Sequence, residues 1–281
     1  MAESTILNKE EKTLGKIQYH THIRPGDVGK YVLLPGDPDR VLRIAKYLDN
    51  AHEIAFNREH RTWTGTYKGI TVSATSTGMG CPSTAIAVEE LANVGATHFI
   101  RVGSTGALQA GINIGDLIIN TGSMRLDGSC KYYVHDGFPA IADHYFTHAL
   151  IETALDHKKA HSYGLHVGLG TTTDAFYGET PELIQMMIDH HMLNVEMESS
   201  VIYTIAHRRG LKAATVCAVS GNLKTGDVIY EEVNTRLAQG WEDAIQVALD
   251  GICSYEAKGY EALSNSLLSA QFETKRYHPV W

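Results

Sequence analysis

The sequence predicts a single α/β domain over residues 1–281, and three observations support this prediction. Apolar runs of strand length alternate with segments of helical spacing along the whole chain. No linker rich in Pro, Gly or Ser divides the chain. The length of 281 residues, with 43% hydrophobic and 20% charged residues, is compatible with one large core. In such folds, ligands bind where strand ends meet helix starts.

The first third of the chain predicts an arm, a strand, a helix and three further strands. Residues 1–16 are polar and charged, as in a loose terminal arm. The apolar run 31–34 predicts a strand that stops at a turn over 35–38. A helix through 40–48 follows, with an aspartate as its cap and a proline in its first turn. Residues 52–76 contain three strand-like pieces separated by short turns.

The rest of the chain continues the alternation. Glycines in 76–83 allow the backbone to approach a ligand closely before a helix begins. The expected strands are 98–106, 116–121, 164–169, 194–197 and 213–219, and the expected helices are 84–94, 145–159, 181–190, 199–209 and 231–253. Residues 124–144 predict an irregular excursion, which in a compact domain is usually functional. Residues 171–177 predict a turn, and a polar tail follows the last helix.

Composition excludes several classes of function. The net charge of −8 argues against general nucleic-acid binding. The four cysteines are far apart, so neither a disulfide framework nor a zinc or other metal site is expected. No apolar run approaches membrane-spanning length, and the start of the chain does not resemble a signal peptide. We therefore expect a cytoplasmic protein without a membrane partner.

Charged residues at strand ends indicate an anion site. Arg101 lies in an apolar run that ends in a Gly- and hydroxyl-rich turn, and a buried arginine there needs either an anionic ligand or a carboxylate partner. Arg40 and Arg58 also lie beside turns, and several guanidinium groups around glycine backbone suit a phosphate dianion. Glu196 and Glu198 stand at a strand-to-helix junction, where a carboxylate can bind vicinal hydroxyls or interact with the helix dipole.

Five motifs together resemble the nucleoside phosphorylases of the uridine phosphorylase and hexameric purine nucleoside phosphorylase type. Overall, the chain resembles the uridine phosphorylases most. The five motifs are residues 35–40, 57–59, 76–91, 101–106 and 196–198, and the resemblance runs in family order from about residue 20 to residue 222. The resemblance implies a three-layer α/β/α fold with a mixed central sheet. Residues 257–281 lie outside it.

The resemblance also implies an activity. The expected enzyme is a pentosyltransferase that cleaves a nucleoside, uridine or a related pyrimidine nucleoside, with phosphate as co-substrate and with no cofactor. The implied phosphate-binding residues are Gly36, Arg40, Arg58, Arg101 and Ser104. The implied ribose-binding residues are His20, Ser104, Met197 and Glu198, and those for the base are Thr105, Gly106, Phe176 and Asn222. Arg101, Glu198 and His20 are the implied catalytic residues.

The resemblance further implies an assembly. His20 and Arg58 match residues that serve the neighbouring subunit's site, so a homodimer is the expected catalytic unit, within a homohexamer. Glu59 and Ser83 match positions that hold a monovalent cation between subunits in some family members.

The base pocket departs from the family pattern. Thr180 and Glu182 stand where uridine phosphorylases carry a glutamine and an arginine, and Gly221 stands where the purine enzymes carry an aspartate. Losing such groups alters specificity. A purine or broad-specificity phosphorylase and a nucleoside-binding protein without catalysis therefore remain alternatives, whereas the retained arginines argue against a hydrolase.

Overall fold

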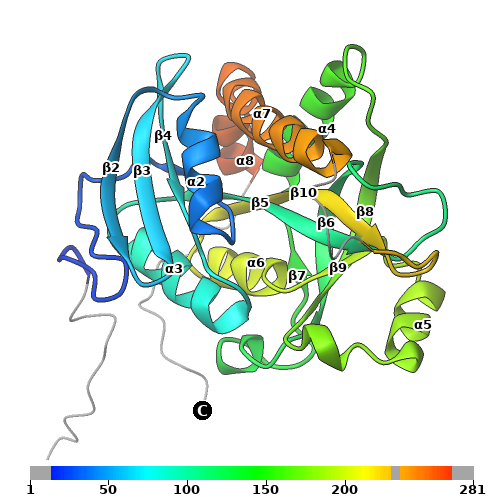
Figure 1. Ribbon diagram of the computed structural model, residues 1–281. Coiled ribbons are helices and arrows are strands. Elements are labelled where there is room, and N and C mark those ends of the chain that lie inside the picture. The colour runs from blue at the N-terminus through cyan, green and yellow to red at the C-terminus, as the bar shows by residue number, and fades with distance from the viewer. Residues whose placement is uncertain (1–13, 229–234, 268–281) are drawn as a thin grey trace, which may run out of the picture.

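The computed structural model describes residues 14–228 and 235–267, whose strands form one mixed sheet (Figure 1). The strands are β1 (Tyr31–Leu34), β2 (Asp49–Asn57), β3 (His60–Tyr67), β4 (Ile70–Thr75), β5 (His98–Ala107), β6 (Leu117–Leu126), β7 (Ala140–Ile141), β8 (Leu165–Thr173), β9 (Asn194–Glu196), β10 (Lys212–Asn222) and β11 (Asp227–Val228). The helices are α2 (Pro38–Ala45), α3 (Cys81–Asn93), α4 (His144–His157), α5 (Pro181–Asp189), α6 (Ser199–Arg208), α7 (Thr235–Ala257) and α8 (Tyr260–Leu267), with short 3-10 helices η1 (Cys130–Tyr132) and η2 (Phe176–Gly178).

Local chemistry explains the first elements. All four residues of β1 are buried, as expected of a strand that is covered on both faces. α2 begins after Asp37, whose carboxylate accepts a hydrogen bond from the backbone N–H of Asp39 (2.9 Å). Pro38 occupies the first turn, where a backbone N–H would have no acceptor within the helix. The helix thereby starts immediately after the strand and presents its N-terminus at the strand end.

Five strands close into a ring. β5 pairs in parallel with β1 and β10, and β10 pairs antiparallel with β6. β6 pairs in parallel with β8, β8 pairs in parallel with β9, and β9 returns antiparallel to β5. β5 belongs to this ring and also pairs with β1 outside it, so it is the structural centre of the sheet.

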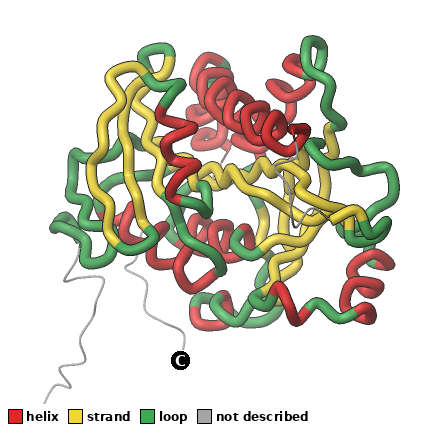
Figure 2. The backbone as a smooth tube through the Cα atoms, viewed as in Figure 1, coloured by secondary structure: helices red, strands yellow, loops and turns green. Residues whose placement is uncertain are grey.

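Helices cover both faces of the sheet (Figures 1 and 2). Side chains alternate along a strand, so Tyr31 and Leu33 of β1 join the core with α4 and α7. Val32 and Leu34 point the opposite way and join the core with α3 and α6. The predicted three-layer α/β/α fold with a mixed central sheet is confirmed.

Some expected boundaries differ. β8 continues through Thr171–Thr173, where we expected a turn, because these residues pair with Met124–Leu126 of β6. Residues 260–267, expected in a polar tail, form α8, which packs against α4 and α7. Within residues 14–228 and 235–267, no helix is long and apolar enough to cross a membrane. The segments outside the described residues are 1–13, 229–234 and 268–281, which include most of the expected arm, the expected helix start at 231 and the end of the tail.

The packing of α4 against β1 and α7 can be tested by substitution. Phe146 is fully buried, with ring centroids 6.1, 5.4 and 5.0 Å from those of Tyr31, His98 and Tyr255. We expect Phe146→Ala to lower the free energy of unfolding in urea by about 3–5 kcal/mol, because it leaves a cavity. Leu155→Ala on the same helix, at a side chain that is 52% exposed, should cost less than about 1 kcal/mol. Equal losses would contradict this assignment.

Candidate active site

A cavity of about 790 Å³ lies at the carboxyl ends of β1, β5, β8, β9 and β10. Nine of the twelve residues expected in the site line it: Gly36, Arg40, Arg101, Ser104, Thr105, Gly106, Phe176, Met197 and Glu198. His20, Arg58 and Asn222 do not. β1, β5 and β10 are parallel, so their carboxyl ends lie at one edge, and β9, which is antiparallel to β5, brings Val195 beside Gly106.

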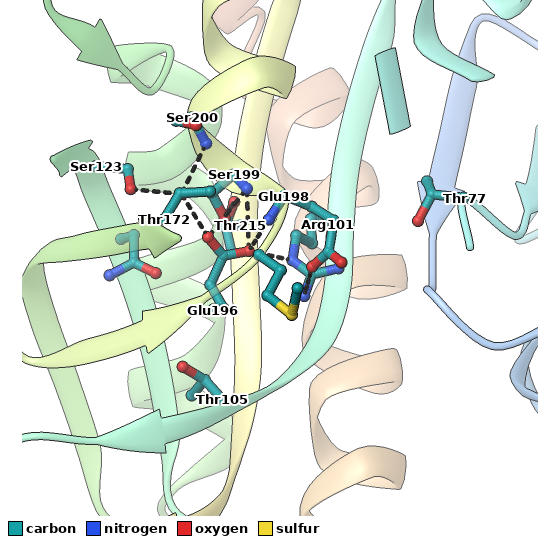
Figure 3. Close-up of polar contacts among 12 residues, drawn as sticks. Thr77, Arg101, Thr105, Ser123, Thr172, Glu196, Glu198, Ser199, Ser200 and Thr215 are labelled. Atoms are coloured by element: carbon teal, nitrogen blue, oxygen red, sulfur yellow. Dashed lines mark hydrogen bonds and ion pairs between the residues drawn. The ribbon is translucent and has the colours of Figure 1, made fainter. Parts of the chain in front are cut away.

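Arg101, on β5, lies between two buried glutamates (Figure 3). Its Nε is 2.7 Å from Glu196 Oε2, and its Nη2 is 2.5 Å from Glu198 Oε2. The side chain folds back over Gly103, where a Cβ would come within 2.8 Å of the guanidinium carbon. Of the two partners that the sequence left open, the structure shows the carboxylates, and Arg101 also lines the cavity. Its buried Nη1 has no hydrogen-bond partner among the described residues.

Hydrogen bonds hold both glutamates in place. Glu196 accepts from the Thr172 hydroxyl (2.6 Å) and from the backbone N–H groups of Glu198 (3.0 Å) and Ser199 (2.9 Å) at the start of α6. Glu198 Oε1 accepts from the N–H of Gly80 (2.6 Å). Burial raises the pKa of Glu198 against the opposing effect of Arg101. Burial acts to lower the pKa of Arg101, but Glu198 and Glu196 outweigh it, so this pKa is raised and the guanidinium stays charged.

Trp241, which was not among the residues expected in the site, contacts two residues that were, Ser104 and Arg40. Trp241 of α7 donates from Nε1 to Ser104 Oγ (2.9 Å), and its ring centroid lies 4.3 Å from Arg40 Cζ. Because the indole N–H is only a donor, Ser104 accepts here and keeps its own proton for a ligand oxygen. Arg40 Nε is buried and has no partner among the described residues. Ser104 and Arg40 are therefore oriented and still able to donate.

The glycine-rich turn before α3 forms another wall. Gly78 has φ +70°, and a Cβ there would lie 2.7 Å from Glu59 Cγ, so a larger residue is strained and lacks room. Ser83 Oγ donates to Glu59 Oε1 (2.7 Å), and this hydrogen bond lowers the pKa of Glu59. The two residues expected near a cation are therefore in contact.

Apolar side chains line the part of the cavity around Gly106, which we call the apolar end. Val195 and Leu223 lie beside Gly106, and Phe176 of η2 also lines the cavity. The side chain of Thr105 is already engaged, since its hydroxyl donates to Val195 O (2.7 Å) and accepts from Asn194.

The structure corrects the expected role of Asn222 at the base. Its amide donates to the carbonyls of Gln109 (2.9 Å) and Ile112 (2.8 Å), and its oxygen accepts from the N–H of Lys224 (2.9 Å). Asn222 thus organises a turn, and the next residue, Leu223, lines the cavity instead.

Thr180 and Glu182, which stand at the expected base-reading positions, also lie outside the cavity lining. Thr180 is the N-cap of α5 and accepts from Leu183 N (3.3 Å), while Glu182 is exposed in the first turn of that helix. Glu179 lines the cavity instead. Burial raises the pKa of its carboxyl group.

His20 and Arg58 lie away from the cavity of their own chain. His20 Nδ1 is 2.7 Å from Glu90 Oε1, and its carbonyl accepts from Asn57 Nδ2 (2.6 Å). Arg58 is exposed at the turn between β2 and β3, with φ +54°, and lines a separate surface depression with Tyr19.

The fold and the cavity define a class of protein with a cavity, lined by arginines and carboxylates, at the edge of a mixed sheet. Residues 30–252 match the family described as the phosphorylase superfamily. This chain belongs to that superfamily, and the predicted nucleoside phosphorylase, a pentosyltransferase, is thereby confirmed.

Individual relatives agree with this assignment. The uridine phosphorylase of Thermococcus kodakarensis is 48% identical over 242 residues, covering 81% of this chain and 85% of that one. The guanosine phosphorylase of Halorubrum lacusprofundi is 37% identical over 232 residues, covering 83% and 95%. The crystal structure of uridine phosphorylase from Vibrio fischeri ES114 superposes with a TM-score of 0.76 at 36% identity, covering 84% of this chain and 97% of that one.

The Trp241 contact predicts a selective defect in phosphate binding. Trp241→Phe keeps an aromatic ring beside Arg40 but removes the donor to Ser104. We expect the KM for phosphate to rise about 2- to 10-fold, the effect of one neutral hydrogen bond, in steady-state phosphate titrations. The matched control is Trp63→Phe, whose Nε1 donates to Glu53 on an exposed part of the sheet. An unchanged KM in Trp241→Phe would contradict the role in orienting Ser104.

Proposed function

We propose that this enzyme cleaves uridine or a related pyrimidine nucleoside with inorganic phosphate, giving the free base and ribose or deoxyribose 1-phosphate. The observation that carries the proposal is that three kinds of group line one cavity. Arg40 and Arg101 have guanidinium nitrogens without a hydrogen-bond partner among the described residues, Glu198 offers a carboxylate, and Phe176 offers an aromatic ring. These groups suit phosphate, sugar and base, respectively. The uridine phosphorylases among its relatives support the choice of base.

The same groups suggest the mechanism. A phosphate oxygen attacks the anomeric carbon while the carbon–nitrogen bond breaks, and the bonding electrons leave with the base, which then takes up a proton. Positive charge develops on the sugar, and the bound phosphate and the buried Glu198 stabilise it. Met197 packs beside the sugar, and Glu198 orients its hydroxyls. Since phosphate is the nucleophile, no covalent enzyme intermediate forms.

We also propose a homodimer as the catalytic unit, assembled into a homohexamer. Within one chain, the charge of Arg101 is already balanced by Glu196 and Glu198, which leaves Arg40 as the one arginine without an ion pair among the described residues that line the cavity. A phosphate dianion needs more positive charge than this. Arg58 of a second copy would supply it, and His20 of that copy would bind the sugar's 5′-hydroxyl. Around these two residues, Ile17, Tyr19 and Phe56 expose more than half of their surface, which suits an interface.

A further expectation fits the site without being needed for the reaction. Glu59, the Ser83 hydroxyl and the Thr77 carbonyl, whose oxygen is 2.5 Å from Ser83 Oγ, offer oxygen ligands that suit a monovalent cation at a subunit boundary. We propose no cofactor in the reaction itself. The four cysteines are free, which agrees with a reducing, cytoplasmic location.

The reaction predicts strict dependence on phosphate. The purified chain should consume uridine with phosphate and should be inactive without it, with uracil and a sugar 1-phosphate appearing in equal amounts by chromatography. Inosine and adenosine, assayed in parallel, test the purine alternative. Activity that is undiminished without phosphate would indicate a hydrolase, and inactivity on all three nucleosides would refute both phosphorylase assignments.

The shared site predicts complementation between two inactive variants. Arg40→Ala should damage a chain's own cavity, and Arg58→Ala should damage the partner's. If the dimer shares residues as proposed, co-expressing the two variants restores about a quarter of the wild-type activity. Random pairing makes about half of the dimers mixed, and each mixed dimer has one intact site out of two. Lys159→Ala, which removes an ion pair with Asp156 between two exposed side chains, is the control in place of Arg40→Ala. If co-expression restores no activity, Arg58 acts within its own chain.

A further inference from the structure

Glu179 is an ionisable side chain among the described residues that line the cavity. It directly follows η2, three positions after Phe176, which lines the cavity as well. Within the described part of the chain its hydrogen-bond partner is the Thr173 hydroxyl, at a long 3.3 Å, and no cation lies within ion-pair distance. Glu179 is half-buried and therefore partly desolvated without compensation.

Polar side chains at the apolar end are already engaged. Thr105 is occupied by Val195 and Asn194, and the Ser220 hydroxyl donates to Thr105 O (3.2 Å). Glu179 is thus the side chain with free hydrogen-bonding capacity that a ligand would meet next to Phe176. An incompletely paired carboxylate in a cavity favours a ligand that donates to it.

We propose that Glu179 selects the base, by accepting a hydrogen bond from the ring N–H of a lactam base such as uracil, hypoxanthine or guanine. The proposal rests on the proposed function, since it takes a nucleoside as the ligand. Cytosine and adenine present a lone pair at the corresponding ring nitrogen, which an ionised carboxylate repels. The substrate class is therefore that of lactam nucleosides, with uridine preferred to cytidine among pyrimidines and inosine to adenosine among purines.

Charge, rather than shape, sets this preference. Uridine and cytidine have nearly the same size and stack equally on Phe176, but they differ at the ring nitrogen and the neighbouring exocyclic group. A carboxamide has both an NH2 group that donates and a carbonyl oxygen that accepts, so it can form a hydrogen bond with the ring nitrogen of either base. A carboxylate only accepts. Glu179→Gln should therefore relax discrimination while keeping the volume of the side chain.

The test compares nucleosides that differ at this edge. Binding of uridine and cytidine to Glu179→Gln and to the wild type is measured by calorimetry, and turnover is measured separately with phosphate. We expect the uridine-to-cytidine affinity ratio to fall about 10- to 100-fold, as for a hydrogen bond to a charged group. The KM for phosphate should stay unchanged. Glu182→Gln, the same substitution on the exposed first turn of α5, should leave the ratio unchanged.

Two results would overturn the proposal: a wild type that binds cytidine as tightly as uridine, or an unchanged ratio in Glu179→Gln. A wild type that binds nucleosides selectively but turns none of them over would refute the proposed function alone. In that case the binding ratios still decide the role of Glu179.

Discussion

The ion pairs of Arg101 with Glu196 and Glu198 are the contacts on which the site depends. They connect the central strand β5 to the junction of β9 and α6, and through Gly80 to the turn before α3. Removing one member would leave an uncompensated buried charge, which costs several kcal/mol. The same charges are those that phosphate and a positively charged sugar would meet. Stability and chemistry therefore constrain the same residues, and the geometry of this end of the cavity has little freedom to vary.

The sequence was sufficient to predict which segments meet, because strand ends and turn residues are local signals. Arg40, Arg101 and Glu198 each lie at such a signal, and each lines the cavity. Trp241 carries no comparable signal, since it lies within a long helix, 137 positions from the Ser104 that it contacts. The ring closure between β5 and β10 is likewise a long-range pairing that periodicity does not encode.

The positions of Thr180 and Asn222 outside the cavity lining have a local explanation. Thr180 precedes Pro181, a combination typical of a helix N-cap, and a capping side chain turns back toward its own helix. Asn222 caps a turn through its own backbone neighbours, as asparagine commonly does. In both cases the side chain satisfies the local backbone, so it is unavailable to a ligand.

The two ends of the cavity are therefore built differently. The arginine end belongs to the sheet and is held by several buried charge-assisted contacts. The other end depends on η2 and the segment before α5, which is more exposed and in which Glu179 makes one weak hydrogen bond. A substitution there disturbs few contacts, so recognition of the base can change while the chemistry at the sugar stays constant. Relatives named for uridine and for guanosine both align with this chain over most of its length, as this division of the cavity leads one to expect.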